Sequence, residues 1–360
     1  MKLMKRLSVA SMALLIALPL VETHAGPLRD RLRERMQETQ AQRNDGSGTG
    51  SASAAEAGDV SDLGGIGGNA MTCEEWSQKV SRLQKRSNGS NAGPHPDLKD
   101  VAYGSQAQQK LDVFFPKNTG RGGMAPIILM VHGGGWCVGD KAGAQMTANK
   151  VARWASRGFV FVSINYPMVN DGSNAVVQAN HVAKAAAFVQ GKAREWGGDP
   201  ARLILMGHSA GAHLVSLVNA DARIRQNNGV GPLLGTVSLD AGAIDVVRQM
   251  PNVYPFLRVR YREAFGTAEA DWIAASPYHT LDRTASPWLG VCSTTRKDDP
   301  CGQARAYAEK SNALGVKASV LPQRKKHGAI NAELGAPGDY TREVEAFMAS
   351  LDPAVAGLLR

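Results

Sequence analysis

The sequence predicts an α/β protein with a mostly parallel sheet and helices on both faces. Past Thr72, short apolar runs of β type alternate with longer stretches of helical periodicity, the pattern of a parallel sheet covered by its crossover helices. In addition, two glycine-rich motifs each follow directly on an apolar run, which places both at strand ends. No internal repeat is visible, so we expect one folded domain over residues 71–360.

The strands are predicted from short apolar runs. The earliest, Lys110 to Phe115, is expected to be antiparallel to its neighbours. Six further runs have the length and apolar content of buried strands: Pro126 to His132, Phe159 to Tyr166, Arg202 to Met206, Gly235 to Asp240, Trp288 to Ser293 and Val316 to Leu321.

Helices are predicted between the strands from apolar positions three or four residues apart. This spacing predicts a helix over residues 174–196, and others around Met146 to Ser156, from Ala210 onward and over Tyr340 to Leu351. Over residues 243–287 the alternation stops. This excursion either caps a pocket or adds to the core, and the sequence leaves both alternatives open. Its aromatic residues are Tyr254, Phe256, Tyr261, Phe265, Trp272 and Tyr278.

The N-terminal 70 residues carry export signals. Residues 1–25 combine basic residues, an apolar run from Leu7 to Leu20 and a small-x-small end before Gly26, the pattern of a secretory signal peptide. An uncleaved membrane anchor is the alternative. Residues 26–70 are rich first in arginine and then in glycine, serine and alanine, which predicts a flexible linker. We therefore expect an exported protein, periplasmic or secreted.

The charge pattern argues against a nucleic-acid partner. The formal net charge is +9, but lysine and arginine outside the linker are dispersed without interleaved aromatic residues. Contact with a membrane is expected only transiently, through the signal peptide. The sequence does not indicate an oligomeric state.

Four cysteines remain after removal of the signal peptide: Cys73, Cys137, Cys292 and Cys301. Disulfides persist in an oxidising compartment. Cys292 and Cys301 flank a short polar loop, which favours a bridge between them and leaves Cys73 to pair with Cys137. No pair has the CxxC spacing of a zinc site, so we expect neither a metal nor an organic cofactor.

Two motifs carry the chemistry. Gly-His-Ser-Ala-Gly at 207–211 lies between an apolar run and a helix-compatible stretch, which predicts a tight strand-to-helix turn that exposes the hydroxyl of Ser209. A serine hydroxyl at such a turn is a candidate nucleophile once a base takes its proton. His-Gly-Gly-Gly-Trp at 132–136 follows another strand. Its glycines leave backbone N–H groups accessible, as the stabilisation of an anionic tetrahedral intermediate requires.

These motifs resemble the α/β-hydrolase superfamily, in particular the esterase and lipase branch that carries HGGG and GxSAG. The resemblance covers about Tyr103 to Leu351 and is close to carboxylesterase, feruloyl-esterase-like and arylformamidase-like members. It implies the α/β-hydrolase fold and an oxyanion hole made by the N–H groups of Gly134, Gly135 and Ala210. Trp136 beside them either walls the acyl pocket or belongs to the core.

The resemblance also implies a triad in the order serine, acid, histidine. The histidine after the last strand, His327, is then the base. The acid is expected after the penultimate strand, where we favour Asp298 over Asp299, because Pro300 restricts Asp299 to extended conformations. Asp240, at the end of the preceding strand, is a third candidate. The acid orients the imidazole and stabilises the imidazolium.

We therefore predict a serine carboxylic-ester hydrolase that acts through an acyl-enzyme on small or aryl esters, without a cofactor. An arylformamidase-like amidase is one alternative, and it would turn over N-formyl aryl amines faster than aryl acetates. A non-catalytic envelope-binding protein on the same scaffold is the other. Such a protein typically lacks a member of the triad, whereas this sequence retains candidates for every member.

Overall fold

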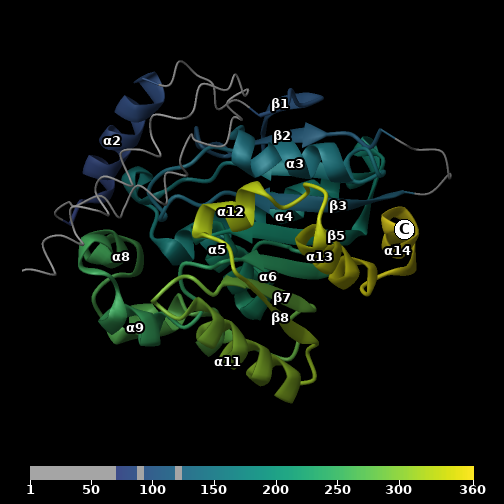
Figure 1. Cartoon of the computed structure of the whole chain (residues 1–360). Coiled ribbons are helices and arrows are strands. Elements are labelled where there is room, and N and C mark those ends of the chain that lie inside the picture. The colour runs from purple at the N-terminus through teal and green to yellow at the C-terminus, as the bar shows by residue number, and fades with distance from the viewer. Residues whose placement is uncertain (1–69, 87–92, 118–123) are drawn as a thin grey trace, which may run out of the picture. The chain divides into compact units, whose positions relative to one another are not determined.

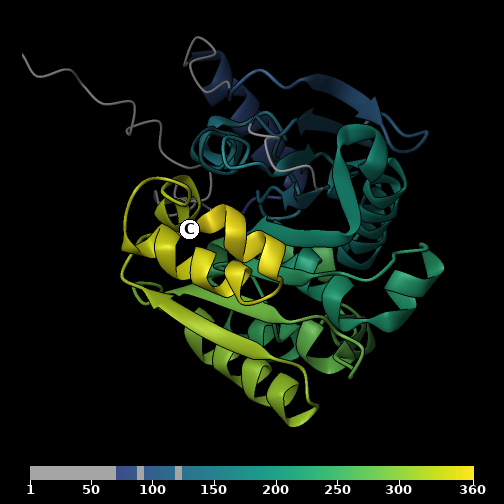
Figure 2. The ribbon, with the colours of Figure 1, turned by 90° about the vertical axis from the view of Figure 1, so that its right-hand side faces the viewer.

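The computed structural model describes residues 70–86, 93–117 and 124–360. The predicted signal peptide lies outside these residues, and so does the predicted linker up to residue 69. In the described part, the strands form a mostly parallel sheet with helices around it (Figures 1 and 2). The predicted fold class is confirmed.

The sheet consists of β1 (Leu98–Ala102), β2 (Lys110–Phe114), β3 (Ala125–Val131), β4 (Val160–Ile164), β5 (Gly198–His208), β6 (Gly235–Leu239), β7 (Trp288–Ser293) and β8 (Ala318–Gln323). Their order is β1-β2-β4-β3-β5-β6-β7-β8. β2 pairs antiparallel with β1 and β4, and every pair from β4 to β8 is parallel. The predicted antiparallel strand is therefore confirmed.

The helices of the described residues are α2 (Cys73–Arg86), α3 (Ala144–Trp154), α4 (Ala175–Lys192), α5 (Ala210–Ala220), α6 (Ala222–Asn227), α7 (Val246–Gln249), α8 (Arg258–Phe265), α9 (Glu269–Ala274), α10 (Pro277–Thr280), α11 (Pro300–Ala313), α12 (His327–Ala332), α13 (Asp339–Ala349) and α14 (Pro353–Leu359). Short 3-10 turns are η2 (Val169–Asp171), η3 (Ala193–Trp196), η4 (Met250–Asn252) and η5 (Pro255–Leu257).

Helices cover both faces of the sheet because successive side chains of a strand point to opposite sides. In β3, Ile127 and Leu129 join a core that includes residues of α4 and α5, whereas Ile128 and Met130 join a second core with residues of α3 and α13. Every residue of β3 is consequently buried. This is why the strand has a continuous apolar sequence rather than an alternating one.

Some elements have no apolar signature and were not predicted. β1 is an edge strand with a largely exposed sequence. α11 begins at Pro300, in what the sequence indicates as a loop. Proline suits the first turn of a helix, because the N–H there needs no partner. Asp299 caps this helix with its side chain, which accepts the N–H of Gly302, and it has φ 51° and ψ 51°. The extended conformation predicted for Asp299 is therefore wrong.

The excursion over residues 243–287 contains α7 to α10 and two 3-10 turns. Two of its aromatic residues, Tyr261 and Phe265 of α8, are buried in the same core as Trp136. The core alternative therefore holds for this pair. That the excursion caps a pocket stays a prediction.

None of the helices in the described residues is long and apolar enough to span a membrane. In the same residues, no three His, Cys, Asp or Glu side chains are grouped so that they could hold a metal ion.

Candidate active site

Ser209 occupies a tight turn between β5 and α5. Its φ of 56° and ψ of −116° are unfavourable for a residue with a β-carbon. The turn also requires glycine on either side. A β-carbon on Gly207 would lie 2.3 Å from the carbonyl oxygen of Gly211, and one on Gly211 would lie 2.2 Å from that of Val131. The strand-to-helix turn predicted from the sequence is thus formed.

The glycine loop, residues 132–136, lies directly against this turn. A β-carbon on Gly133 would come within 2.9 Å of both the β-carbon of Ser209 and the carbonyl oxygen of His208. Only glycine lets the two backbones approach this closely. This close approach at Gly133 was not predicted from the sequence, although the run of three glycines was an available signal.

The amides expected to form an oxyanion hole have no other acceptor in the described part of the chain. Gly134 and Gly135 have φ values of 117° and 64°, and Trp136 also has a positive φ of 64°. Among the described residues, no acceptor takes the backbone N–H of Gly134, Gly135 or Ala210. Ala210 is the first residue of α5, so its N–H also lies at the positive end of the helix dipole.

Trp136 belongs to the core. It is 1% exposed, its ring contacts Tyr261 and Phe265 edge-on, and its indole N–H donates to Nδ1 of His213 over 3.2 Å. Nε2 of His213 donates in turn to the carbonyl oxygen of Ala275 over 2.7 Å. Burial lowers the pKa of His213 to about 4, so a neutral ring accepts the indole proton. Trp136 thereby anchors the glycine loop to the core.

His327 pairs with Asp240. Nδ1 of His327 donates to Oδ2 of Asp240 over 2.5 Å, and the other carboxylate oxygen accepts the N–H of Ser293 over 2.8 Å. His208 Nε2 donates to the carbonyl oxygen of His327 over 3.0 Å, and the two rings lie 4.6 Å apart. The residue directly before Ser209 therefore ties His327 to the turn.

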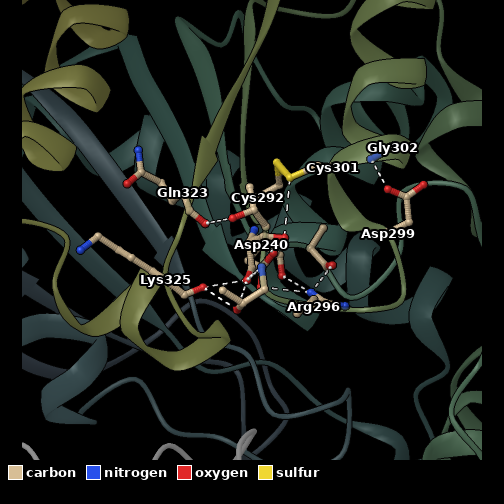
Figure 3. Close-up of a disulfide and its surroundings, with 12 residues drawn as sticks. Asp240, Cys292, Arg296, Asp299, Cys301, Gly302, Gln323 and Lys325 are labelled. Atoms are coloured by element: carbon tan, nitrogen blue, oxygen red, sulfur yellow. Dashed lines mark hydrogen bonds and ion pairs between the residues drawn. A yellow bond between two sulfur atoms is a disulfide. The ribbon is translucent and has the colours of Figure 1, made fainter.

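Asp298, the favoured acid, pairs with Arg296 instead. It accepts hydrogen bonds from Nε and Nη2 of Arg296. The same guanidinium reaches Asp240, with Nη1 3.1 Å from Oδ2. Nη1 is 3.5 Å from Nδ1 of His327, a contact without a hydrogen bond because Nδ1 directs its proton to Asp240. In Figure 3, Asp240 and Arg296 lie together beside a disulfide.

Asp299, the alternative acid, faces away from this cluster (Figure 3). It caps α11 through Gly302 and forms an exposed ion pair of 2.9 Å with Arg248. Asp240, the third candidate, is thus the carboxylate that meets His327. Asp298 is not available to His327 because Arg296, two residues before it, binds the Asp298 carboxylate through two hydrogen bonds.

The charges of the cluster alternate along Asp298, Arg296, Asp240 and His327. Burial by itself raises the pKa of Asp240, but the Arg296 charge and the hydrogen bond from His327 outweigh it and hold the pKa well below its usual range. Burial likewise opposes the charge of Arg296, yet Asp240 and Asp298 raise its pKa. Asp240 is therefore ionised throughout the neutral range.

Both predicted disulfides are formed. Cys73 is bonded to Cys137 and Cys292 to Cys301, with Cα atoms 5.1 and 5.2 Å apart. The first joins α2 to the residue after the glycine loop. The second closes the loop that carries Arg296 (Figure 3). Each bridge fixes a segment that contacts the candidate site.

A cavity of about 100 Å³ adjoins the glycine loop. Two buried polar atoms of its lining, Nε2 of His132 and Oδ1 of Asn331, have no hydrogen-bond partner among the described residues. Other lining residues are Gly133, Gly134, Met146 and His208. This cavity is therefore small and partly polar, and it is lined by the residue before Ser209 but not by Ser209 itself.

Comparisons with known proteins agree with this architecture. The model of the BD-FAE family matches residues 111–286. A probable carboxylic ester hydrolase of Mycobacterium tuberculosis is 31% identical over 65% of this chain and 54% of its own length. A probable isoprenylcysteine alpha-carbonyl methylesterase of Arabidopsis thaliana is 26% identical over 62% of this chain and 49% of its own length. The chain thus spans about half the length of these curated relatives.

Solved structures with the same fold include Esterase B from Lactobacillus rhamnosis, with a TM-score of 0.60 and 18% identity over 79% of this chain and 94% of that one. A truncated carbohydrate esterase from gut microbiota has a TM-score of 0.57 and 20% identity over 72% of this chain and 99% of that one. The chain shares the α/β-hydrolase fold with these structures. On this fold, Ser209, Asp240 and His327 follow β5, β6 and β8, at one edge of the sheet.

Proposed function

We propose that this protein is a serine carboxylic-ester hydrolase of the α/β-hydrolase superfamily, with Ser209 as nucleophile, His327 as base and Asp240 as the orienting acid. The observation that carries the proposal is the 2.5 Å hydrogen bond between His327 Nδ1 and Asp240, on a histidine tied to the residue before Ser209. The esterase names of the relatives and of the structural neighbours support the same class of reaction.

In the acylation step, His327 removes the proton of Ser209 while Oγ attacks the ester carbonyl carbon. Because Nδ1 of His327 is occupied by Asp240, Nε2 is the atom that takes this proton. The ionised carboxylate stabilises the imidazolium that results. His327 then gives the proton to the departing alcohol, and water releases the acid by the reverse path.

The negative oxygen of the tetrahedral intermediate is assigned to the amides of Gly134, Gly135 and Ala210. Their lack of any other acceptor among the described residues supports this role. One such donor typically lowers the barrier by about 3 kcal/mol. Because the glycine loop is held by Trp136 and the Cys73–Cys137 bridge, the donors are in place before the substrate binds.

We further propose small acyl groups as substrates. The supporting observation is the small size, about 100 Å³, of the cavity that His208 and the glycine loop line, although Ser209 itself is not among its lining residues. Two disulfides in the described residues and the N-terminal sequence pattern support export, to the periplasm or the medium, of a catalytic domain at 71–360.

The decisive experiment measures the hydrolysis of 4-nitrophenyl esters from acetate to decanoate. We expect the wild type to prefer short chains and Ser209→Ala to lose at least about 10³-fold in kcat. Ser319→Ala, which removes an exposed serine of β8, is the matched control and should keep wild-type rates. A wild type inactive on every ester, or an active Ser209→Ala, rejects the proposal.

A further inference from the structure

His327 is the first residue of α12, a helix of only six residues. Its side chain meets Asp240, and its carbonyl oxygen accepts a hydrogen bond from His208. A helix this short is not stable by itself in water, because nucleation of the first turn is unfavourable. The direction in which His327 points therefore depends on the contacts that hold α12 in the fold.

The far end of α12 is held by side chains of α3 and α13. The last carbonyl groups of a helix have no partner within it, and here three successive carbonyl oxygens each accept a side-chain donor. α12 lies beside α3 (Figure 1), which supplies two of the donors. The three pairs are Tyr340 Oη to Ile330 over 2.8 Å, Lys150 Nζ to Asn331 over 2.5 Å and Asn149 Nδ2 to Ala332 over 2.7 Å.

Lys150 is the charged member of these three donors, and its burial is costly. It is 1% exposed, and burial lowers its pKa to about 7. Lys141, also buried, pairs with the carboxylate of Asp112 over 2.9 Å. Lys150 instead bonds to backbone carbonyl oxygens, those of Asn331 and, over 3.1 Å, of Gln145. A methionine would avoid the cost of the buried amine, but it would leave the end of α12 without this donor.

The support on which α12 rests is itself fixed. Val151 and Trp154 of α3 are buried in a core shared with residues of β3. Trp154 donates its indole N–H to Glu345 of α13 over 3.1 Å, so the two helices that hold α12 are joined to each other. The bond from Lys150 to Asn331 spans 181 residues of sequence. It therefore ties the helix of the base to a part of the fold that is packed on the sheet.

We propose that Lys150 is a positioning residue of the active site, which holds α12 through the carbonyl oxygen of Asn331 and so keeps the imidazole of His327 directed at Asp240. The inference rests on the proposed function, since it concerns the base of that same site. Lys150 acts through the backbone of α12. A displacement of about 1 Å in a reacting group can lower the rate about 10²-fold.

The test replaces Lys150 by methionine, which has a similar length and no donor. We expect kcat on a 4-nitrophenyl ester to fall about tenfold to hundredfold, with KM within about twofold of the wild type, because the binding contacts remain. The matched control is Arg157→Met. Arg157 donates to the carbonyl oxygen of Leu359 in α14 over 3.0 Å, so this variant loses a similar contact at a helix without a site residue. It should keep the wild-type kcat.

Two further measurements separate positioning from a general loss of stability. In His327→Ala there is no base to position, so the additional change Lys150→Met should leave the residual rate unchanged. The second measurement is the proton NMR signal of Nδ1–H of His327, which the short bond to Asp240 shifts to low field. In folded Lys150→Met this signal should broaden or move upfield. Arg157→Met should keep it.

A Lys150→Met variant with the wild-type kcat or an unchanged His327 signal overturns the inference and leaves the proposed function standing. An equal loss of rate in the presence and absence of His327 also overturns it. If the methionine variant does not fold, Lys150→Gln, whose amide ends one bond short of Nζ, is judged by the same three measurements. A wild type that is inactive on every ester is a failure of the proposed function instead, and the NMR comparison still tests the position of His327.

Discussion

Asp240 contacts an arginine as well as a histidine, and this sets it apart from a carboxylate that contacts a histidine alone. Its carboxylate accepts a hydrogen bond from Nδ1 of His327 and faces Arg296, which in turn is balanced by Asp298. Without Asp298, the guanidinium would draw more of the Asp240 charge away from the imidazolium. In the proposed mechanism, Asp298 therefore acts on the acid through Arg296 and is not itself the acid.

Exchanging each carboxylate for its amide separates the two roles. Asp240→Asn should lower kcat on a 4-nitrophenyl ester about 10³- to 10⁴-fold, because the amide can no longer hold Nδ1 protonated and facing it. Asp298→Asn, the isosteric control, should lose less than about tenfold because it does not touch His327. The measurement is the steady-state kcat of each variant. A larger loss of kcat in Asp298→Asn than in Asp240→Asn would assign the role of the acid to Asp298.

At the scale of elements, apolar runs predicted the strands well because a strand that is buried on both faces has a continuous apolar sequence. β1 and α11 escaped prediction because an edge strand and a proline-initiated helix carry no such run. The aspartate that pairs with His327 could not be chosen from the sequence either. It depends on where Arg296 points, and this is fixed by a loop closed through Cys292 and Cys301.

Removal of this bridge should loosen the loop that presents Arg296. Closing so short a loop contributes about 2 to 3 kcal/mol by restricting the unfolded chain. The double variant Cys292→Ala/Cys301→Ala should lose this amount in the free energy of unfolding, measured by urea denaturation without reductant. Cys73→Ala/Cys137→Ala, which opens a loop of sequence separation 64, should lose more, about 4 kcal/mol. Unchanged stability in the first variant would contradict the argument.

At the scale of the whole molecule, the parallel sheet collects its chemistry at one edge. Ser209, Asp240, Arg296 and His327 follow successive neighbouring strands, β5 to β8, although the hydrogen bond from His208 to His327 spans 119 residues. The two motifs and the order of strands were enough to single out Ser209 and His327 as candidates.

Core histidines also make the stability of the whole fold depend on pH. The pKa of His213 is lowered to about 4 in the native state, so between pH 6.5 and 4 the unfolded chain binds more protons there. Stability should therefore fall as the pH falls through this window. From pH 7 to pH 5 the contribution of His213 is about 2 kcal/mol.

The measurement is chemical denaturation of the wild type and of His213→Gln at both pH values. Glutamine can still accept from Trp136 and donate to Ala275, so it keeps the packing and removes the titration. We expect the variant to lose about 2 kcal/mol less than the wild type on acidification. Equal losses in the two proteins would show that His213 does not titrate as its burial implies.

The conformation of Ser209 has a consequence for the history of such a chain. A φ of 56° with a ψ of −116° is easy for glycine and awkward for anything larger. A mutation from serine to glycine at position 209 should therefore stabilise the fold while it removes the proposed nucleophile. Ser209→Gly should unfold at a higher urea concentration than Ser209→Ala, which keeps the awkward β-carbon. In the proposed mechanism, the serine is retained for catalysis and not for the stability of the fold.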